Sequence, residues 1–119
     1  MATHTFTSPG RIGRRVLYCL NDADVREIQW QRQLAGKGSR NGNDPKEGQV
    51  YPGVIVADFY SPLASDEKRT VEDRQTRLEQ SSVNLQVFLD GNDSYWATSR
   101  SQWIPGKEIN PLGHWIFAE

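Results

Sequence analysis

Apolar and polar residues alternate between positions 83 and 89, where every second side chain is apolar: Val83, Leu85, Val87 and Leu89. This is the period of a β-strand with one buried face. The following Asp90-Gly91-Asn92-Asp93 consists of residue types that close tight turns. Residues 94–100 then carry the aromatic and β-branched residues of a return strand. The pattern predicts a β-hairpin.

Three further strands are predicted at residues 14–20, 49–60 and 114–118. The first is apolar on both faces, with Val16, Tyr18 and Leu20 on one and Leu17 and Cys19 on the other. Such a strand is usually central in its sheet and covered twice. In the second strand, Pro52-Gly53 indicates a bulge or an edge position, since proline cannot donate to a ladder. Val54 to Ala57 is expected to be a buried core segment.

A helix is predicted from Asn21 to about Leu34. Asn21 can cap it, Asp22 and Asp24 lie where the helix dipole favours negative charge, and Gly36 ends it. Val25 and Ile28 share one side of this helix, while Trp30 and Leu34 lie on roughly the opposite side. We expect the protein's own loops to cover Trp30. Exposure would instead make Trp30 and Leu34 an interaction site.

Outside these elements the chain has the composition of loops. Residues 1–13 are predicted to form a flexible N-terminal arm, and the glycine-rich residues 36–48 a connector. Residues 61–82 are predicted to be a charged, exposed excursion between two strands that pair, with a marginal helix as an alternative, because Val71 and Leu78 are the only apolar residues between 65 and 80. Residues 14–119 are therefore expected to be one domain.

Five strands, one helix after the first strand and no βαβ alternation predict a mainly β protein, a small antiparallel barrel or roll. The strand opened by Gly48-Gln49-Val50-Tyr51, followed by Val87-Phe88-Leu89-Asp90-Gly91-Asn92 at a hairpin, resembles SH3-like barrels of the Tudor type. Tudor domains have an aromatic residue after the Asp and a short loop between these strands, and this chain has neither. The resemblance covers some 30 residues.

A second resemblance spans most of the chain from residue 14, apart from 61–82. It is carried by Tyr51-Pro52-Gly53-Val54-Ile55-Val56, by residues 83–99 and by a Trp-containing C-terminal strand. These segments are similar to a group of small accessory proteins of tailed actinobacterial phages. The resemblance implies a phage accessory protein and transfers no catalytic residue.

Charge and cysteine content narrow the chemistry. The formal net charge of −1 creates no global attraction to nucleic acid or membrane, and the single Cys19 excludes an internal disulfide. No apolar run of about 18 residues and no signal peptide occur, so a cytoplasmic protein is expected, in the host cytosol if phage-encoded. Only His4 and His114 are available for proton transfer, and Asp90, Asn92 and Asp93 already serve as turn-formers. We therefore expect no enzymatic activity, no cofactor and no metal.

Binding is the remaining class of function. The first hypothesis is a host-takeover or anti-defence protein that binds a host protein through exposed aromatic and apolar residues: Trp30, Leu34, Tyr51, Tyr95, Trp96 and Trp103. The second is sequestration of a nucleotide or nucleic acid, with phosphates on Arg14, Arg15, Lys37 and Arg40 and a base stacked on an aromatic ring. A virion component or homo-oligomeric scaffold is the third.

Overall fold

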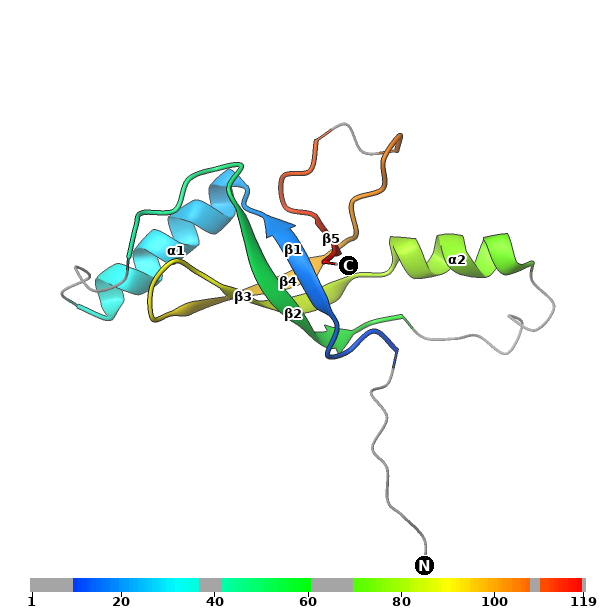
Figure 1. The fold of residues 1–119 in the computed structure, drawn as a ribbon, viewed down its shortest axis with the longest axis horizontal. Coiled ribbons are helices and arrows are strands. Elements are labelled where there is room, and N and C mark those ends of the chain that lie inside the picture. Colours follow the sequence, from blue (N-terminus) through cyan, green and yellow to red (C-terminus); the bar gives the residue numbers. More distant parts are fainter. Residues whose placement is uncertain (1–9, 37–41, 61–69, 108–109, 119) are drawn as a thin grey trace, which may run out of the picture.

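The computed structural model describes residues 10–36, 42–60, 70–107 and 110–118, and these form five strands and two helices. In chain order the elements are β1 (Arg15–Cys19), α1 (Asp22–Leu34), β2 (Val50–Asp58), α2 (Val71–Gln80), β3 (Val83–Phe88), β4 (Ser94–Arg100) and β5 (Trp115–Phe117). The strands make one antiparallel sheet in the order β4-β3-β2-β1-β5 (Figure 1). The five antiparallel strands and the helix after the first strand are confirmed.

The sheet is open, so the predicted closed barrel or roll is wrong. Within the described residues, β4 and β5 are the two edges, and no ladder joins them. The chain returns to β5 only beyond β4, where Gln102 forms a single parallel bridge with Trp115. The register of β4 against β3 shifts near Ser99, whose φ is +55°. Strand β5 has three residues, which form a ladder with β1 on one side and, in the described chain, only the single bridge to Gln102 on the other.

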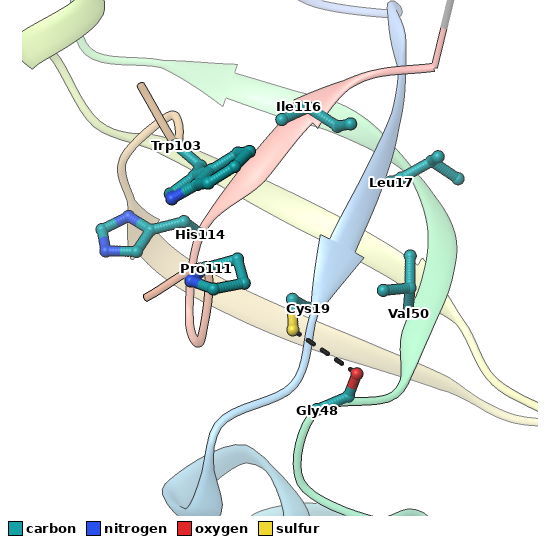
Figure 2. A pocket seen from close by; sticks show the side chains of 8 residues that line it. All are labelled: Leu17, Cys19, Gly48, Val50, Trp103, Pro111, His114 and Ile116. Carbon is teal, nitrogen blue, oxygen red and sulfur yellow. Dashed lines mark hydrogen bonds between the residues drawn. The ribbon is translucent and has the colours of Figure 1, made fainter. Parts of the chain in front are cut away.

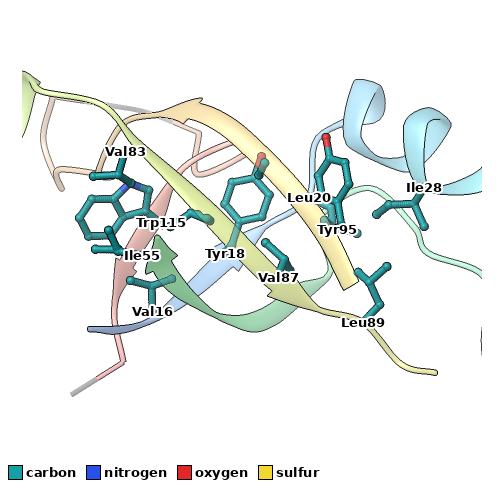
Figure 3. Packing of buried hydrophobic residues seen from close by; sticks show 12 residues of the cluster. Val16, Tyr18, Leu20, Ile28, Ile55, Val83, Val87, Leu89, Tyr95 and Trp115 are labelled. Atoms are coloured by element: carbon teal, nitrogen blue, oxygen red, sulfur yellow. The ribbon is translucent and has the colours of Figure 1, made fainter. Parts of the chain in front are cut away.

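The core lies on one face of the sheet and against one side of α1. The alternating residues predicted to be buried are buried, namely Val16 and Tyr18 of β1, Leu20 directly after β1, and Val83, Leu85 and Val87 of β3. Figure 3 shows all of these except Leu85 labelled in one cluster with Ile28 of α1 and Trp115 of β5, and Leu85 belongs to the same cluster. Their removal from water is the main contribution to the stability of the fold. Gly53 lies close to the backbone of β3, because a Cβ there would lie 2.6 Å from the Gln86 carbonyl oxygen.

Helix α1 begins and ends where the sequence predicts. The Asn21 side chain accepts a hydrogen bond from the Asp24 amide, and the Asp24 carboxylate accepts one from the Asn21 amide, which is a capping box. Ile28 is fully buried, whereas Trp30 is 56% exposed and Leu34 is 69% exposed. The expectation that loops of the protein cover Trp30 is therefore wrong. Only the side of α1 that carries Ile28 packs against the sheet.

The charged segment 61–82 contains a second helix, α2, which the sequence left open. The Thr70 side chain caps it by accepting a hydrogen bond of 3.1 Å from the Asp73 amide. None of its residues is buried, and it extends away from the sheet (Figure 1), so the predicted exposure is confirmed. Residues 61–69 lie outside the described residues.

The N-terminal end of the described chain is anchored between β2 and α2. Arg11, placed by the sequence in a flexible arm, is 5% exposed, and its guanidinium Nη2 lies 2.7 Å from the Asp58 carboxylate. The same guanidinium donates to the carbonyl oxygens of Leu78 and Ser81 at the end of α2. Residues 10–13 therefore pack against the domain, and residues 1–9 of the predicted arm lie outside the described residues.

Strand β2 combines a proline with pairing on both sides. Pro52 lies opposite Leu17 of β1, while the ladder with β3 begins one residue later, at Gly53 and Val87. Pro52 thus occupies a locally unpaired position on the β3 side, where a residue without an N–H is tolerated. The register shift lies further on, between Ile55 and Ala57. Of the segment predicted to be buried, Ile55 is buried but Val56 is 41% exposed, because the core covers only one face of β2.

Candidate binding site

An apolar cavity opens on the outer face of β1, β2 and β5, opposite the core. Its floor comes from three strands, because Leu17 pairs with Ile116 on one side of β1 and Cys19 pairs with Val50 on the other. Residues just before β2 and around the β4–β5 connection complete the wall. The cavity has a volume of about 320 Å³ and is lined by Leu17, Cys19, Gly48, Val50, Trp103, Pro111, His114 and Ile116 (Figure 2).

The double apolar character of β1 explains why this cavity exists. One face of the strand packs in the core, as predicted, but neither helix contributes to the lining over its second face. Val50 is therefore 54% exposed and Ile116 is 39% exposed. The prediction that β1 is central is confirmed. The prediction that a second layer covers it is wrong for the described part of the chain.

Backbone hydrogen bonds hold the cavity wall against β1. The Gly113 amide donates to the Cys19 carbonyl at 2.8 Å, and the Cys19 amide donates to the His114 carbonyl at 3.1 Å. The Trp103 amide donates to the Trp115 carbonyl at 2.8 Å. Gly113 has a φ of +77°, and a Cβ there would lie 2.7 Å from the Asn21 side chain, so the turn requires glycine. Backbone hydrogen bonds therefore hold the wall to β1 at Cys19 and to β5 at Trp115.

The lining contains no Asp, Glu, Lys or Arg side chain. Burial raises the pKa of the Cys19 thiol, which keeps it protonated near neutral pH, and its Sγ contacts the Gly48 carbonyl oxygen at 3.6 Å. The His114 ring nitrogen Nδ1 lies 3.0 Å from the Ser101 carbonyl oxygen and 3.2 Å from the Ser101 hydroxyl. The site therefore offers apolar surface and one oriented imidazole.

Comparisons with protein-family models, with curated proteins and with solved structures find no match. In the described chain, neither helix is long and apolar enough to cross a membrane.

The aromatic residues predicted to form one binding surface are distributed over three places. Trp103 lines the cavity. Trp96 is 58% exposed on the outer face of β4, diagonal to the exposed Phe88 of β3. Trp30 and Leu34 lie on the outer side of α1.

The two predicted tyrosines face the interior. Tyr95 is buried in the core and its hydroxyl donates to Asp24. Tyr51 is half-buried against the core, and its hydroxyl donates to Gln49 at 2.9 Å. Neither residue is placed to act as the exposed aromatic anchor that the sequence suggested.

The candidate phosphate contacts are only partly described. The guanidinium carbon of Arg14 lies 3.9 Å from the centroid of the Phe117 ring, which is a cation–π contact, and Arg15 is exposed. Lys37 and Arg40 lie outside the described residues. Nothing in the described structure brings Arg14 and Arg15 to a phosphate-binding loop.

The hairpin tip is occupied by structural contacts. Arg32 of α1 donates to both carboxylate oxygens of Asp93, at 2.9 and 3.1 Å, and this hydrogen bonding lowers the pKa of Asp93. The Asp90 carboxylate accepts a hydrogen bond from the Asn43 side chain. Among the described residues, no group of three or more His, Cys, Asp or Glu side chains could hold a metal ion.

Sequence reasoning missed most of the cavity. Of its lining residues, only Trp103 was among the predicted binding residues. Leu17, Val50, Pro111 and Ile116 come from four separate segments, and no local pattern connects them. The signal in the sequence is the second apolar face of β1, formed by Leu17 and Cys19. The sequence predicts that a second layer covers this face, but in the structure the face is the floor of the open cavity.

Proposed function

We propose that this is a phage accessory protein that binds a protein of its bacterial host through the apolar cavity on β1, β2 and β5. The observation that carries the proposal is an open, uncharged cavity of about 320 Å³ bordered by the exposed side chains of Val50 and Ile116. Apolar area left in contact with water in this way becomes stabilising when a partner covers it.

The chemistry of the lining favours binding over catalysis. Its two titratable groups are Cys19, whose thiol burial keeps protonated, and His114, whose Nδ1 is held by Ser101. General acid–base or nucleophilic catalysis needs a base that faces a proton donor or nucleophile within hydrogen-bond reach. The hydroxyl within reach of His114 is that of Ser101, which does not line the cavity, and the lining contains no such pair of its own. An apolar cavity with an indole in its wall is typical of the centre of a protein interface.

The side-chain hydrogen bonds along the β4 edge favour docking on the face of the sheet over addition of a strand to β4. Side chains already bond carbonyl oxygens along β4: Gln31 bonds that of Ser94 at 2.8 Å, and Trp115 Nε1 bonds that of Arg100 at 3.1 Å. Arg100 Nη1 donates to the Thr98 carbonyl oxygen at 2.9 Å. A partner strand would have to displace these bonds. Docking on the cavity face requires no such exchange.

The choice of a host protein as partner depends on the sequence resemblance to accessory proteins of tailed actinobacterial phages. Such a protein made in an infected cell would act in host takeover or against host defence. A virion component, in contrast, would be found in purified phage particles.

The test is affinity capture from an actinobacterial host lysate with the full chain as bait, comparing Val50→Glu with Val56→Glu. Both residues are exposed valines of β2, at 54% and 41%, but only Val50 lines the cavity. We expect the wild type and Val56→Glu to capture the same host protein, and Val50→Glu to capture about tenfold less or none. Equal capture by both variants, or no specific capture at all, would contradict the proposal.

Two further measurements address the other hypotheses. Detection of the protein in purified virions by mass spectrometry would favour a structural role. Binding of nucleotides or nucleic acid that weakens steeply with salt would favour sequestration. We expect neither result.

A further inference from the structure

The cavity is large enough for a ring. A cavity of about 150 Å³ lined by apolar side chains holds a benzene molecule. The cavity beside β1 has about 320 Å³, roughly twice that volume. A two-ring indole or a substituted phenyl ring therefore fits its size better than a methyl group or a single short side chain does.

The walls are shaped for a flat group. In Figure 2 the rings of Trp103, His114 and Pro111 stand on one side of the cavity. The branched side chains of Leu17 and Val50 stand on the other side, with Cys19 between them. A planar ring inserted between these walls can stack on or meet the edge of the Trp103 indole, which is a favourable arrangement of aromatic pairs.

The lining also selects against charge. It contains no carboxylate, ammonium or guanidinium group to pair with an ionised ligand, and the Cys19 thiol lies against the Gly48 carbonyl oxygen. Moving an unpaired charge into such a site carries a far larger desolvation cost than moving an uncharged ring into it. Charge complementarity thus points to a neutral occupant.

We infer that the cavity receives one uncharged aromatic side chain, of tryptophan, phenylalanine or tyrosine, presented by the partner protein. This inference rests on the proposed function, since it names the chemical group by which the partner is recognised. The aromatic anchor lies between Trp103 and Leu17, and Val50 and Ile116 form the border around it.

The probe is indole, the side chain of tryptophan, titrated into the full-length protein and followed by NMR. Tryptamine and indole-3-acetate are its cationic and anionic counterparts. We expect indole to shift the signals of Trp103, Leu17 and Ile116 with a Kd on the order of 1 mM, and both charged analogues to bind at least about tenfold more weakly. The side-chain signals of Trp30 and Trp96 should not move.

Two matched pairs of variants locate the binding. Val50→Glu places a carboxylate at the cavity and Val50→Trp fills it with a ring, so both should weaken indole binding about tenfold or more. Val56→Glu and Val56→Trp alter an exposed valine of the same strand and should bind indole within about twofold of the wild type. The native spectrum of each variant shows that it is folded. Any of three results would overturn the inference: indole-induced shifts spread over the surface, charged analogues that bind as tightly as indole, or an equal loss of indole binding in the Val50 and Val56 variants.

The outcomes separate this inference from the proposed function. If indole binds as expected but no host protein is captured, the aromatic cavity stands and the host-binding role fails. If Val50→Glu still captures the host protein, or if indole does not bind, the anchor is wrong and the partner uses another surface. Self-association that indole competes with, measured by sedimentation, would count against a host partner, because a second copy would then cover the cavity face.

Discussion

The carboxylate of Asp24 in α1 accepts a hydrogen bond of 2.7 Å from the hydroxyl of Tyr95 in β4. The same carboxylate is bonded by the Tyr18 hydroxyl and by Arg100 Nη2, the latter at 2.7 Å, and it is fully buried. Burial, followed by the hydrogen bond to Asp24, raises the pKa of both tyrosines above the ordinary value, so they stay protonated as donors. Strands β1 and β4 and helix α1 are thus joined through one side chain.

This cluster stabilises the packing of α1 on the sheet. Burial alone would lower the pKa of Arg100, but the hydrogen bond with Asp24 raises it above its ordinary value, so the ion pair persists. No described buried side-chain nitrogen or oxygen lacks a hydrogen-bond partner. A fully bonded polar cluster of this kind specifies one arrangement of its elements, because a shifted helix would leave buried groups unpaired.

We predict that Tyr95→Phe lowers the free energy of unfolding by about 2 kcal/mol, since it removes a donor from a buried carboxylate. Tyr51→Phe is the control, because the Tyr51 hydroxyl bonds the neutral Gln49 amide in a half-buried position. Its effect should be below about 1 kcal/mol. Urea denaturation of both variants at pH 7 measures the difference. Equal effects would show that the Asp24 cluster contributes nothing beyond an ordinary hydrogen bond.

A second prediction concerns acid stability. The hydrogen bonds from Arg11 lower the pKa of Asp58 to about 2, below its ordinary value of 3.8. A lowered folded-state pKa means that the stabilisation is complete above about pH 4 and is lost as the pH falls towards 2. The pKa difference corresponds to about 2 kcal/mol.

The measurement is the free energy of unfolding of the wild type and Asp58→Asn between pH 7 and pH 2. At pH 7 Asp58→Asn should be less stable by about 3 kcal/mol, because it leaves the buried Arg11 without its carboxylate. The gap between the two proteins should narrow as the pH falls from 4 to 2. A gap that stays constant over this interval would show that the ion pair does not set the pH dependence.

Gly53 should be intolerant of any side chain. A Cβ at this position would lie 2.6 Å from the Gln86 carbonyl oxygen, in the ladder between β2 and β3. We expect Gly53→Ala to cost about 1–3 kcal/mol by overpacking. Gly48→Ala is the comparison, since its φ is +88° but no atom lies within 4 Å of the added Cβ. It should cost about 1 kcal/mol from backbone strain alone. A smaller loss at Gly53 than at Gly48 would contradict the packing argument.

The two sides of α1 should respond differently to truncation. Trp30 is 56% exposed and Ile28 is fully buried, although they are two residues apart. Trp30→Ala should change the free energy of unfolding by no more than about 0.5 kcal/mol, as is usual for surface positions. Ile28→Ala should cost about 2–5 kcal/mol by leaving a cavity in the core. Thermal or urea denaturation distinguishes them, and a large loss for Trp30→Ala would mean that the indole is covered in solution.

The elements that could be predicted from the sequence are those whose signals lie in neighbouring residues. The strands were predictable because Val83, Leu85 and Val87 repeat with a period that only a half-buried strand accommodates. The start of α1 was predictable because Asn21 and Asp24 cap it with their own side chains. Helix α2 was harder to predict, since it buries no residue and its pattern carries no core signal.

By itself the sequence determined where the five strands and α1 lie and that Val83, Leu85 and Val87 belong in the core, because those signals are carried by neighbouring residues. Only the tertiary structure decided that the sheet stays open, that Trp30 is exposed, and that Asp24 bonds two tyrosines and an arginine. It also decided that Leu17, Val50, Trp103 and Ile116 surround one cavity. These relationships join residues far apart in the chain, and their existence depends on which surfaces remain uncovered after packing, which no local pattern records.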